Sequence, residues 1–363
     1  AEQAAGLREE LLHRPAARPA ETAGDASERR ETLLARVPAG WVKYGPFTLT
    51  GLVTVGVVAG VVGRTVNEAH LDPGRLGPLS TLLDRWERAP VAAEVVVLGA
   101  LLLVVVAIAS TLGYLLAFYG FRLSRNNAGT LHVTRGLITT RAITIEERRL
   151  RGVELSEPLL LRAVHGARCI AITTGLRVGR GAERGGSLLL PPGPREEAQR
   201  VAAEVLGDAV PLTCPLIPHG ARATRRRFSR AVGAAALIVA ASLVLWALGV
   251  LPAWAWQLSL TLPPAAALLA FDRARTLGHV VSGATLVSRR GALVRRRSAL
   301  SCDGIIGWNL RRSFFQRRAG LTTLIATTAA GRQRVEVQDV EQGEALRTAD
   351  VALPGLLTPF LEH

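Results

Sequence analysis

The sequence predicts an α+β membrane protein with four transmembrane helices in two hairpins and two cytoplasmic domains, each a small bent sheet or open barrel with a C-terminal helix. Three observations predict this fold class. Long apolar runs carry no charge, arginines gather at the ends of these runs, and the polar segments that follow them resemble each other. The chain has 363 residues, 49% apolar and 20% charged, a mixture that suits a membrane protein with sizeable polar domains.

The longest apolar run predicts one complete hairpin. Ala231–Phe271 spans forty-one residues without Asp, Glu, Lys or Arg. One membrane-spanning helix needs about 20 apolar residues, so the run is long enough for two crossings, with a turn at Leu251-Pro252. Trp246, Trp254 and Trp256 surround that turn, where aromatic rings favour the membrane–water interface. The alternative is a buried hairpin in a large soluble core, although such helices rarely stay uncharged on every face.

An earlier pair of apolar runs predicts the other hairpin. Gly45–Gly63 is uncharged, with Trp41 and Tyr44 as an aromatic belt at its entrance, and Val95–Phe121 is a second uncharged run. The polar loop 64–94 between them has a net charge of −1. Because Gly45–Gly63 is short, a buried helix of a soluble domain is the alternative for that segment.

The distribution of arginine predicts the orientation. Lys and Arg number 44 against 29 acidic residues, giving a net charge of +15. Segments 122–230 and 272–363 carry +10 and +6 of this charge. By the positive-inside rule, both segments and the N-terminal tail face the cytoplasm. This placement explains the basic balance without nucleic acid, and the arginines lack the interleaved aromatic residues and recognition motif of a nucleic-acid-binding protein.

Arginines at the cytoplasmic ends of the apolar runs are the candidate site residues for an anionic membrane surface. Each contributes about 1 kcal/mol of attraction to anionic lipid headgroups when it lies close to them. The alternative is that these side chains only set the topology. The residues are Arg122, Arg125, Arg225, Arg226, Arg227, Arg230, Arg273 and Arg275.

The two cytoplasmic segments form an internal repeat. Arg135-Gly136 aligns with Arg290-Gly291, and Gly152 aligns with Gly307. Short alternating runs around a glycine predict a strand pair in each copy, and one apolar strand and one helix follow. The expected strands are Leu131–Thr134, Leu137–Ile143 and Cys169–Thr173, then Thr285–Ser288, Leu293–Ser298 and Thr323–Thr327; the closing helices are Arg195–Leu206 and Val340–Val351. Short strands followed by one helix are typical of an α+β module.

At these residues the chain resembles bacterial membrane proteins of the YdbT type, which carry pleckstrin-homology-like (PH-like) domains. The resemblance depends on three motifs, at Leu131–Arg141, Arg149–Arg162 and Ile170–Gly175, and on the order hairpin, module, hairpin, module. It implies cytoplasmic domains of seven strands with a C-terminal helix, no catalytic residues, and a role in protein–protein assembly at the membrane. The second copy departs from the pattern at Cys302-Asp303-Gly304.

Chemistry-bearing residues do not form a catalytic or metal-binding pattern. The three cysteines are far apart, and none of the seven histidines has a partner at metal-ligand spacing. Cys169 lies in an apolar strand and is expected to pack as a small hydrophobic residue. The apolar runs contain no ionisable residue of the kind that marks an ion pathway. We therefore expect no enzyme activity, no cofactor and no metal.

The expected function is protein–protein assembly at the membrane through the PH-like domains; lipid sensing or handling through the basic surfaces is the alternative. The expected partners are the anionic bilayer and either further copies of the chain or a companion PH-like membrane protein, in a bacterial plasma membrane. The expected organisation is a cytoplasmic tail (1–44, with 1–13 as the closing helix of a preceding domain and then a linker), hairpin 1 (45–121), PH-like domain 1 (122–210), a basic linker (211–230), hairpin 2 (231–271), PH-like domain 2 (272–355) and a C-terminal tail (356–363).

Overall fold

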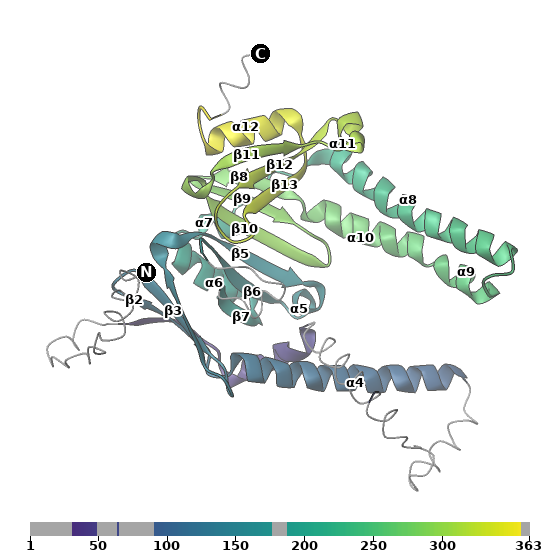
Figure 1. Cartoon of the computed structure of the whole chain (residues 1–363), viewed down its shortest axis with the longest axis horizontal. Coiled ribbons are helices and arrows are strands. Elements are labelled where there is room, and N and C mark those ends of the chain that lie inside the picture. The colour runs from purple at the N-terminus through teal and green to yellow at the C-terminus, as the bar shows by residue number, and fades with distance from the viewer. Residues whose placement is uncertain (1–30, 49–63, 65–90, 176–186, 357–363) are drawn as a thin grey trace, which may run out of the picture.

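A computed structural model describes residues 31–48, 64, 91–175 and 187–356 (Figure 1). The first module in it has seven strands and a closing helix. Strands β1 to β4 form one antiparallel sheet, and β5 to β7 form part of a second. The elements are β1 (Thr32–Arg36), β2 (Arg122–Asn126), β3 (Thr130–Arg135), β4 (Arg141–Glu146), β5 (Leu150–Pro158), β6 (Gly166–Thr173), β7 (Leu188–Pro194) and α6 (Arg195–Leu206), with the short helices η1 (Ala39–Phe47), η3 (Glu147–Arg149), α5 (Leu159–Ala163) and α7 (Val210–Thr213).

The second module repeats this order. Its elements are β8 (Gly278–Ser282), β9 (Thr285–Arg290), β10 (Val294–Ser301), η4 (Cys302–Gly304), β11 (Gly307–Arg311), α11 (Phe314–Ala319), β12 (Leu321–Thr327), β13 (Arg334–Glu341) and α12 (Gln342–Ala352). In place of a first strand, Ile217 forms an isolated bridge with His279 of β8. The predicted α+β repeat, with strands followed by one closing helix, is therefore present in both copies.

In the first module, the apolar helix lies between the first and second strands. β1 pairs with β2, although α4 (Val91–Phe118) and the segment before it separate them in sequence. The Ile217–His279 bridge likewise joins the chain on either side of the second group of helices. The first module thus begins at Thr32, inside the segment that we assigned to the N-terminal tail. The expected closing helix at 1–13 lies outside the described residues.

The two modules share one sheet, which the repeat did not predict. The strand order is β7-β6-β5-β10-β9-β8, so β5 of the first module pairs with β10 of the second (Figure 1). The antiparallel register places Leu300 opposite Gly152 and Val294 opposite Pro158. We call this pairing the seam. Three-stranded β11-β12-β13 completes the second module beside it.

The core of the first module contains two aromatic residues that we expected at the membrane interface. Trp41 and Tyr44 are only 9% and 6% exposed, so the prediction of an aromatic belt there is wrong. The reason is η1, which turns residues 39–47 back over β7. A Cβ atom at Gly193 of β7 would lie 2.4 Å from the Trp41 ring, so only glycine leaves room for that side chain.

Two described helices are long and apolar enough to cross a membrane, by length and composition alone: Gly99–Phe118 within α4, and α8 (Gly220–Ala247). Little of either is covered by protein. After α8 the chain returns as α9 (Ala253–Ser259) and α10 (Leu262–Thr276), with a break ahead of Pro263-Pro264. α4 and the α8–α10 pair extend from the same side of the sheets (Figure 1).

The structure therefore does not establish the expected four crossings. The expected first crossing, Gly45–Gly63, lies mainly outside the described residues, and its first three residues belong to η1. The expected fourth crossing is divided between α9 and α10, because a proline cannot donate the main-chain hydrogen bond that would continue a helix. α7 (Val210–Thr213) and the start of α8 at Gly220 also make most of the expected linker 211–230 helical.

Candidate membrane-proximal site

The structure brings the eight candidate arginines to the places where the helices join the modules. Arg122 and Arg125 lie on β2, just after α4. The four from Arg225 to Arg230 lie on α8, and Arg273 and Arg275 lie in the last turn of α10. The arginines of α8 and α10 come from the same packed helix pair, whereas those of β2 belong to the other module.

Only some of these side chains face solvent. Arg122, Arg225, Arg230, Arg273 and Arg275 are exposed. Arg125 instead turns towards its module, where its Nε lies 2.5 Å from Glu147 Oε1 and its Nη2 donates to the Glu204 carbonyl. Arg226 and Arg227 also turn inwards, from α8 to the second module. The candidate set therefore divides into five residues that can meet an anionic surface and three that fix helices or strands.

Asp339 joins the second module to α8. Arg226 Nη1 lies 2.5 Å from Asp339 Oδ1, and Arg227 Nη2 lies 2.9 Å from Asp339 Oδ2. Gln316 of α11 donates to the same Oδ1 atom at 3.0 Å. The three charged side chains are nearly buried, with exposures of 11%, 6% and 5% for Arg226, Arg227 and Asp339. Burial lowers the pKa of Arg227 to about 10, while the carboxylate of Asp339 opposes this shift.

An irregularity in β13 positions this carboxylate. The pairing of β12 with β13 shifts register between Thr322 and Leu324, and Asp339 has a positive φ of 57°. Such a bulge re-aims a side chain by inserting an extra residue into one strand. Asp and Asn adopt the left-handed region more readily than other non-glycine residues. The bulge thus turns Asp339 towards α8, whose Arg227 stands 112 positions earlier in the chain. A local sequence motif does not show a contact over such a separation.

Two histidines continue this polar junction. His219, just before α8, has Nδ1 2.7 Å from the Gln338 carbonyl oxygen and Nε2 3.0 Å from His279 Nδ1. His279 Nε2 lies 2.9 Å from Thr348 Oγ1 and 4.0 Å from a carboxylate oxygen of Glu344. Burial lowers the pKa of both imidazoles to about 4, and for His219 the proximity of His279 adds to the effect. Both rings are therefore neutral at physiological pH.

We expect the folded protein to lose stability as the pH falls from about 6.5 towards 4. An unfolded histidine has a pKa of about 6.5, so in this window the unfolded chain binds more protons than the folded chain and is favoured. The loss should be about 3 kcal/mol for each histidine. Thermal unfolding of the purified protein across this pH range measures it. A double variant, His219→Gln with His279→Gln, should flatten the dependence; an unchanged slope would contradict the assignment.

Exposed apolar side chains lie around the ends of α4, α8 and α10 that join the modules. The β3–β4 turn lies against the end of α4, where Gly136 N donates to the Tyr119 carbonyl. Arg162 and Arg295 both pair with Asp272 of α10, which holds α5 and the start of β10 beside that helix. Arg226 also donates to Ser313, the N-cap of α11. The exposed residues at these places, which we call the apolar rim, are Leu137, Ile138, Leu159, Leu160, Leu293, Phe314 and Phe315.

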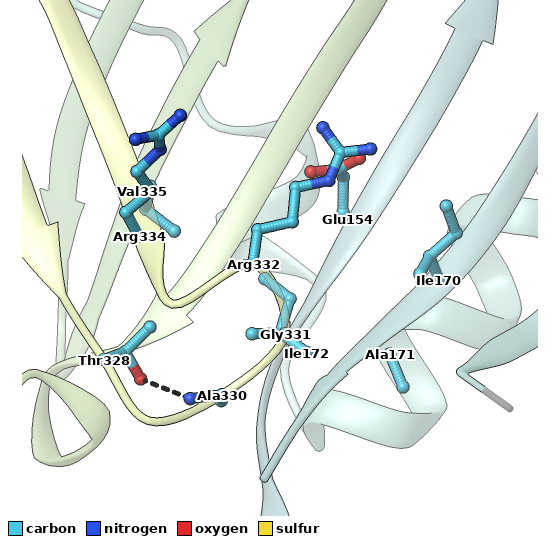
Figure 2. Close-up of a pocket in the computed structure, with 10 residues that line it drawn as sticks. All are labelled: Glu154, Ile170, Ala171, Ile172, Thr328, Ala330, Gly331, Arg332, Arg334 and Val335. Carbon is cyan, nitrogen blue, oxygen red and sulfur yellow. Dashed lines mark hydrogen bonds between the residues drawn. The ribbon is translucent and has the colours of Figure 1, made fainter. Parts of the chain in front are cut away.

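A cleft lies where the modules meet (Figure 2). β5 and β6 line one side, and the turn between β12 and β13 lines the other, with Glu154 and Arg332 among the lining residues. Glu154 accepts hydrogen bonds from Arg296 at 3.2 Å and Ser298 at 3.4 Å, both from β10. Gly331 N donates to the Thr173 carbonyl at 2.9 Å. These contacts join the two modules, so we assign the cleft to their interface.

Cys169 behaves as the sequence predicts. It is fully buried in β6, and burial raises the pKa of its thiol to about 12. Such a thiol is uncharged at physiological pH and unreactive as a nucleophile. Within the part of the chain that the structure describes, no three His, Cys, Asp or Glu side chains cluster as metal ligands would.

Sequence reasoning missed the residues that make the junction. Asp339, the His219–His279 pair and Glu154 all act through partners more than fifty positions away. The repeat offered a partial signal, because it aligned Gly152 with Gly307 and so placed β5 and β11 in equivalent positions. No spacing in the sequence marks the two histidines as neighbours.

Comparison with known proteins gives one match. A family model described as bacterial PH domain matches the chain twice, over residues 77–209 and 228–350. Each match includes an apolar helix and the module that follows it, as in the repeat unit that the sequence predicts. No curated protein and no solved structure matches. Since the two matches cover well over half of the chain, this protein belongs to the bacterial PH domain family.

Proposed function

We propose that this chain is a non-enzymatic membrane protein whose PH-like domains assemble proteins at the cytoplasmic face of a bacterial plasma membrane. The observation that carries the proposal is the seam. Two PH-like domains already bind each other within the chain, through the main-chain pairing of β5 with β10. Strand pairing of this kind gives affinity through main-chain hydrogen bonds, and side chains supply specificity.

Charged side chains support the association of the two domains. Arg296 of β10 lies 3.2 Å from Glu154 of β5, and Arg151 lies 2.7 Å from Asp303 in η4. The first pair is largely buried, at 21% and 10% exposure, and is therefore less screened by salt than a surface pair. A PH-like domain of this chain thus presents a strand edge and matched charges as a protein-binding surface.

Affinity purification of the tagged full-length protein from native bacterial membranes tests the proposal. We expect a second membrane protein or an untagged copy of the chain to co-elute at constant stoichiometry, identified by mass spectrometry. Isolation of the tagged chain alone, from membranes solubilised in several mild detergents, would contradict it.

Lipid handling is the second candidate function, favoured by the apolar rim next to the exposed arginines. Apolar side chains that enter the interface, together with nearby basic residues, are typical of proteins that bind anionic membranes. Phe314 and Phe315 are 63% and 67% exposed. Arg317 and Arg318 follow them on the same short helix.

Removing the exposed arginines should reduce the bound anionic lipid without changing stability. We expect a variant with Arg225, Arg230, Arg273 and Arg275 replaced by Ala to retain several-fold less anionic lipid after purification, because each loses about 1 kcal/mol of attraction to headgroups. Quantitative lipid mass spectrometry measures the loss. The matched control replaces the same residues with Lys, which keeps the charge and should keep the lipid. Equal lipid content in the Ala and Lys variants would contradict the prediction.

A further inference from the structure

The internal repeat shows which strand edges are equivalent. With Arg135 aligned to Arg290 and Gly152 to Gly307, β4 corresponds to β10 and β5 corresponds to β11. The registers agree, because Thr130 pairs with Glu146 in the first module as Thr285 pairs with Ser301 in the second. In the seam, β5 pairs with β10. The equivalents of these two strands, β11 and β4, are each the last strand of their sheet among the described residues.

Both of these edges are open to solvent. On β4, Arg141, Ala142 and Thr144 are exposed. On β11, Leu310 is 40% exposed, and Ile306, just before the strand, is 67% exposed. An exposed edge strand with apolar side chains presents unpaired main-chain groups and is a ready site for another strand.

The equivalent glycines of β5 and β11 differ in what lies beside them. Gly152 in the seam has a φ of 158°, and a Cβ atom built on this backbone would lie 2.0 Å from the Ala299 carbonyl oxygen of β10, so this position requires glycine. Gly307 occupies the equivalent position on β11, and nothing lies within 4 Å of a Cβ atom built on it. The fold of the described chain thus leaves room for any side chain at Gly307. A strand placed on β11 as β10 is placed on β5 would therefore meet no side chain at this position.

We propose that β11 of one copy of this chain pairs with β4 of a second copy, antiparallel and in the register of the seam. The inference rests on the proposed assembly function and names its binding surface. In this register Gly307 lies opposite Ile145, Trp308 opposite Thr144 and Leu310 opposite Ala142. The occupant is a second copy because each chain carries both β4 and β11. When the contact repeats from copy to copy, each chain uses its β4 once and its β11 once.

The position of the apolar helices agrees with such an assembly. The contact is heterologous, so it builds a ring or an open row of copies. Within one chain, the seam leaves α4 and the α8–α10 pair on the same side of the sheets (Figure 1). Repeating the seam between copies therefore keeps the apolar helices on one side, as a single bilayer requires.

One pair of side chains makes the register testable by charge. The proposed pairing places Arg141 opposite Arg311, whereas the equivalent pair in the seam is Arg296 opposite Ser156. Like charges directly opposite each other weaken a strand pair. Arg311→Glu should therefore strengthen the contact at low salt, and Arg141→Glu combined with Arg311→Glu should weaken it again. A contact in another register would not show this reversal.

Disulfide cross-linking between two differently tagged copies, co-expressed in native membranes, tests the pairing. One copy carries Ala142→Cys and the other Leu310→Cys. Opposite residues of an antiparallel pair lie about 4.5–5.5 Å apart at Cα, within reach of a disulfide. We expect a cross-linked dimer carrying both tags. The control replaces Leu310→Cys with Asn309→Cys, which points to the other face of the strand and should give no dimer. Equal cross-linking in both, or none in either, would overturn the proposed register.

Leu310→Arg separates this inference from the proposed function. The variant should lower the yield of co-eluting second copies several-fold, because it adds a positive charge next to Arg141 and Arg311. It should keep the thermal stability of the parent, because Leu310 is 40% exposed. If the variant still co-elutes with its partner as the parent does, the β11–β4 contact is wrong and assembly occurs elsewhere. If the parent itself co-elutes with nothing, the proposed function fails as well.

Discussion

Replacing Asp339 with Ala is expected to destabilise the protein by about 3–5 kcal/mol, which is the usual cost of removing one partner from a buried ion pair. The substitution leaves Arg226 and Arg227 with buried guanidinium groups and no carboxylate between them. Alanine is also less tolerant than Asp of the positive φ at this position. A loss of this size is a large part of the total stability of an ordinary domain, about 5–15 kcal/mol.

Thermal unfolding in detergent, followed by tryptophan fluorescence, measures the effect. Asp339→Asn should lie between the parent and the Ala variant, because Asn tolerates the same backbone conformation and still accepts hydrogen bonds but carries no charge. The matched control is Glu341→Ala, two residues along. Its contact with Arg222 is 3.7 Å long, with both side chains about two-thirds exposed, so its loss should change stability by less than about 0.5 kcal/mol. Equal effects at Asp339 and Glu341 would show that the Asp339 junction does not hold α8.

Replacing Gly152 with Val should open the seam between the two PH-like domains. Its Cβ atom would lie 2.0 Å from the Ala299 carbonyl and 3.0 Å from Leu300 Cα, both main-chain atoms that move only with their strand. We expect a loss of about 3 kcal/mol or more, at the upper end of the range for overpacking. Separation of the strands would also expose the buried Glu154–Arg296 pair.

A disulfide within the seam reports its opening directly. Arg295 lies opposite Glu157 in the register, so Arg295→Cys with Glu157→Cys should cross-link inside one chain, and Gly152→Val should abolish that cross-link. Gly307→Val is the matched control at the equivalent position of the other module, and should leave the intrachain cross-link intact. A seam that closes normally with valine at 152 would disprove the steric argument.

Helices and strands that bury a regular face were predictable from the sequence. The closing helix Arg195–Leu206 agrees with α6 to the residue, since Ala198, Val201, Ala202 and Val205 form one buried face at helical spacing. The strand expected from Leu137 was wrong at its start. Residues 136–140 form a turn, in which Gly136 has a φ of 116°. Leu137 and Ile138 lie in this turn and face outwards at the end of α4, so their apolar character reflects position near the apolar helices and not a strand.

β1 and the division of the candidate arginines could not be predicted in the same way. The five residues of β1 show little alternation of apolar and polar side chains. Their partner β2 follows α4, far along the chain. Arg225 and Arg227 stand two positions apart in a run of like charge. One is exposed and the other buried, because helical spacing turns them to different faces of α8 and only one face meets Asp339.

The sequence by itself determined the apolar segments, their bordering arginines and the repeat, because composition, charge and periodicity are properties of neighbouring residues. Only the tertiary structure decided that the two modules share a sheet, that Asp339 holds α8 and that β4 and β11 are the last strands of their sheets among the described residues. Strand edges pair over any distance along the chain, and a strand has the same period on an open edge as on a paired one. Gly152 and Gly307 are therefore alike in the sequence repeat. In the structure, Gly152 has a φ of 158° and faces β10, whereas nothing lies within 4 Å of a Cβ atom built on Gly307.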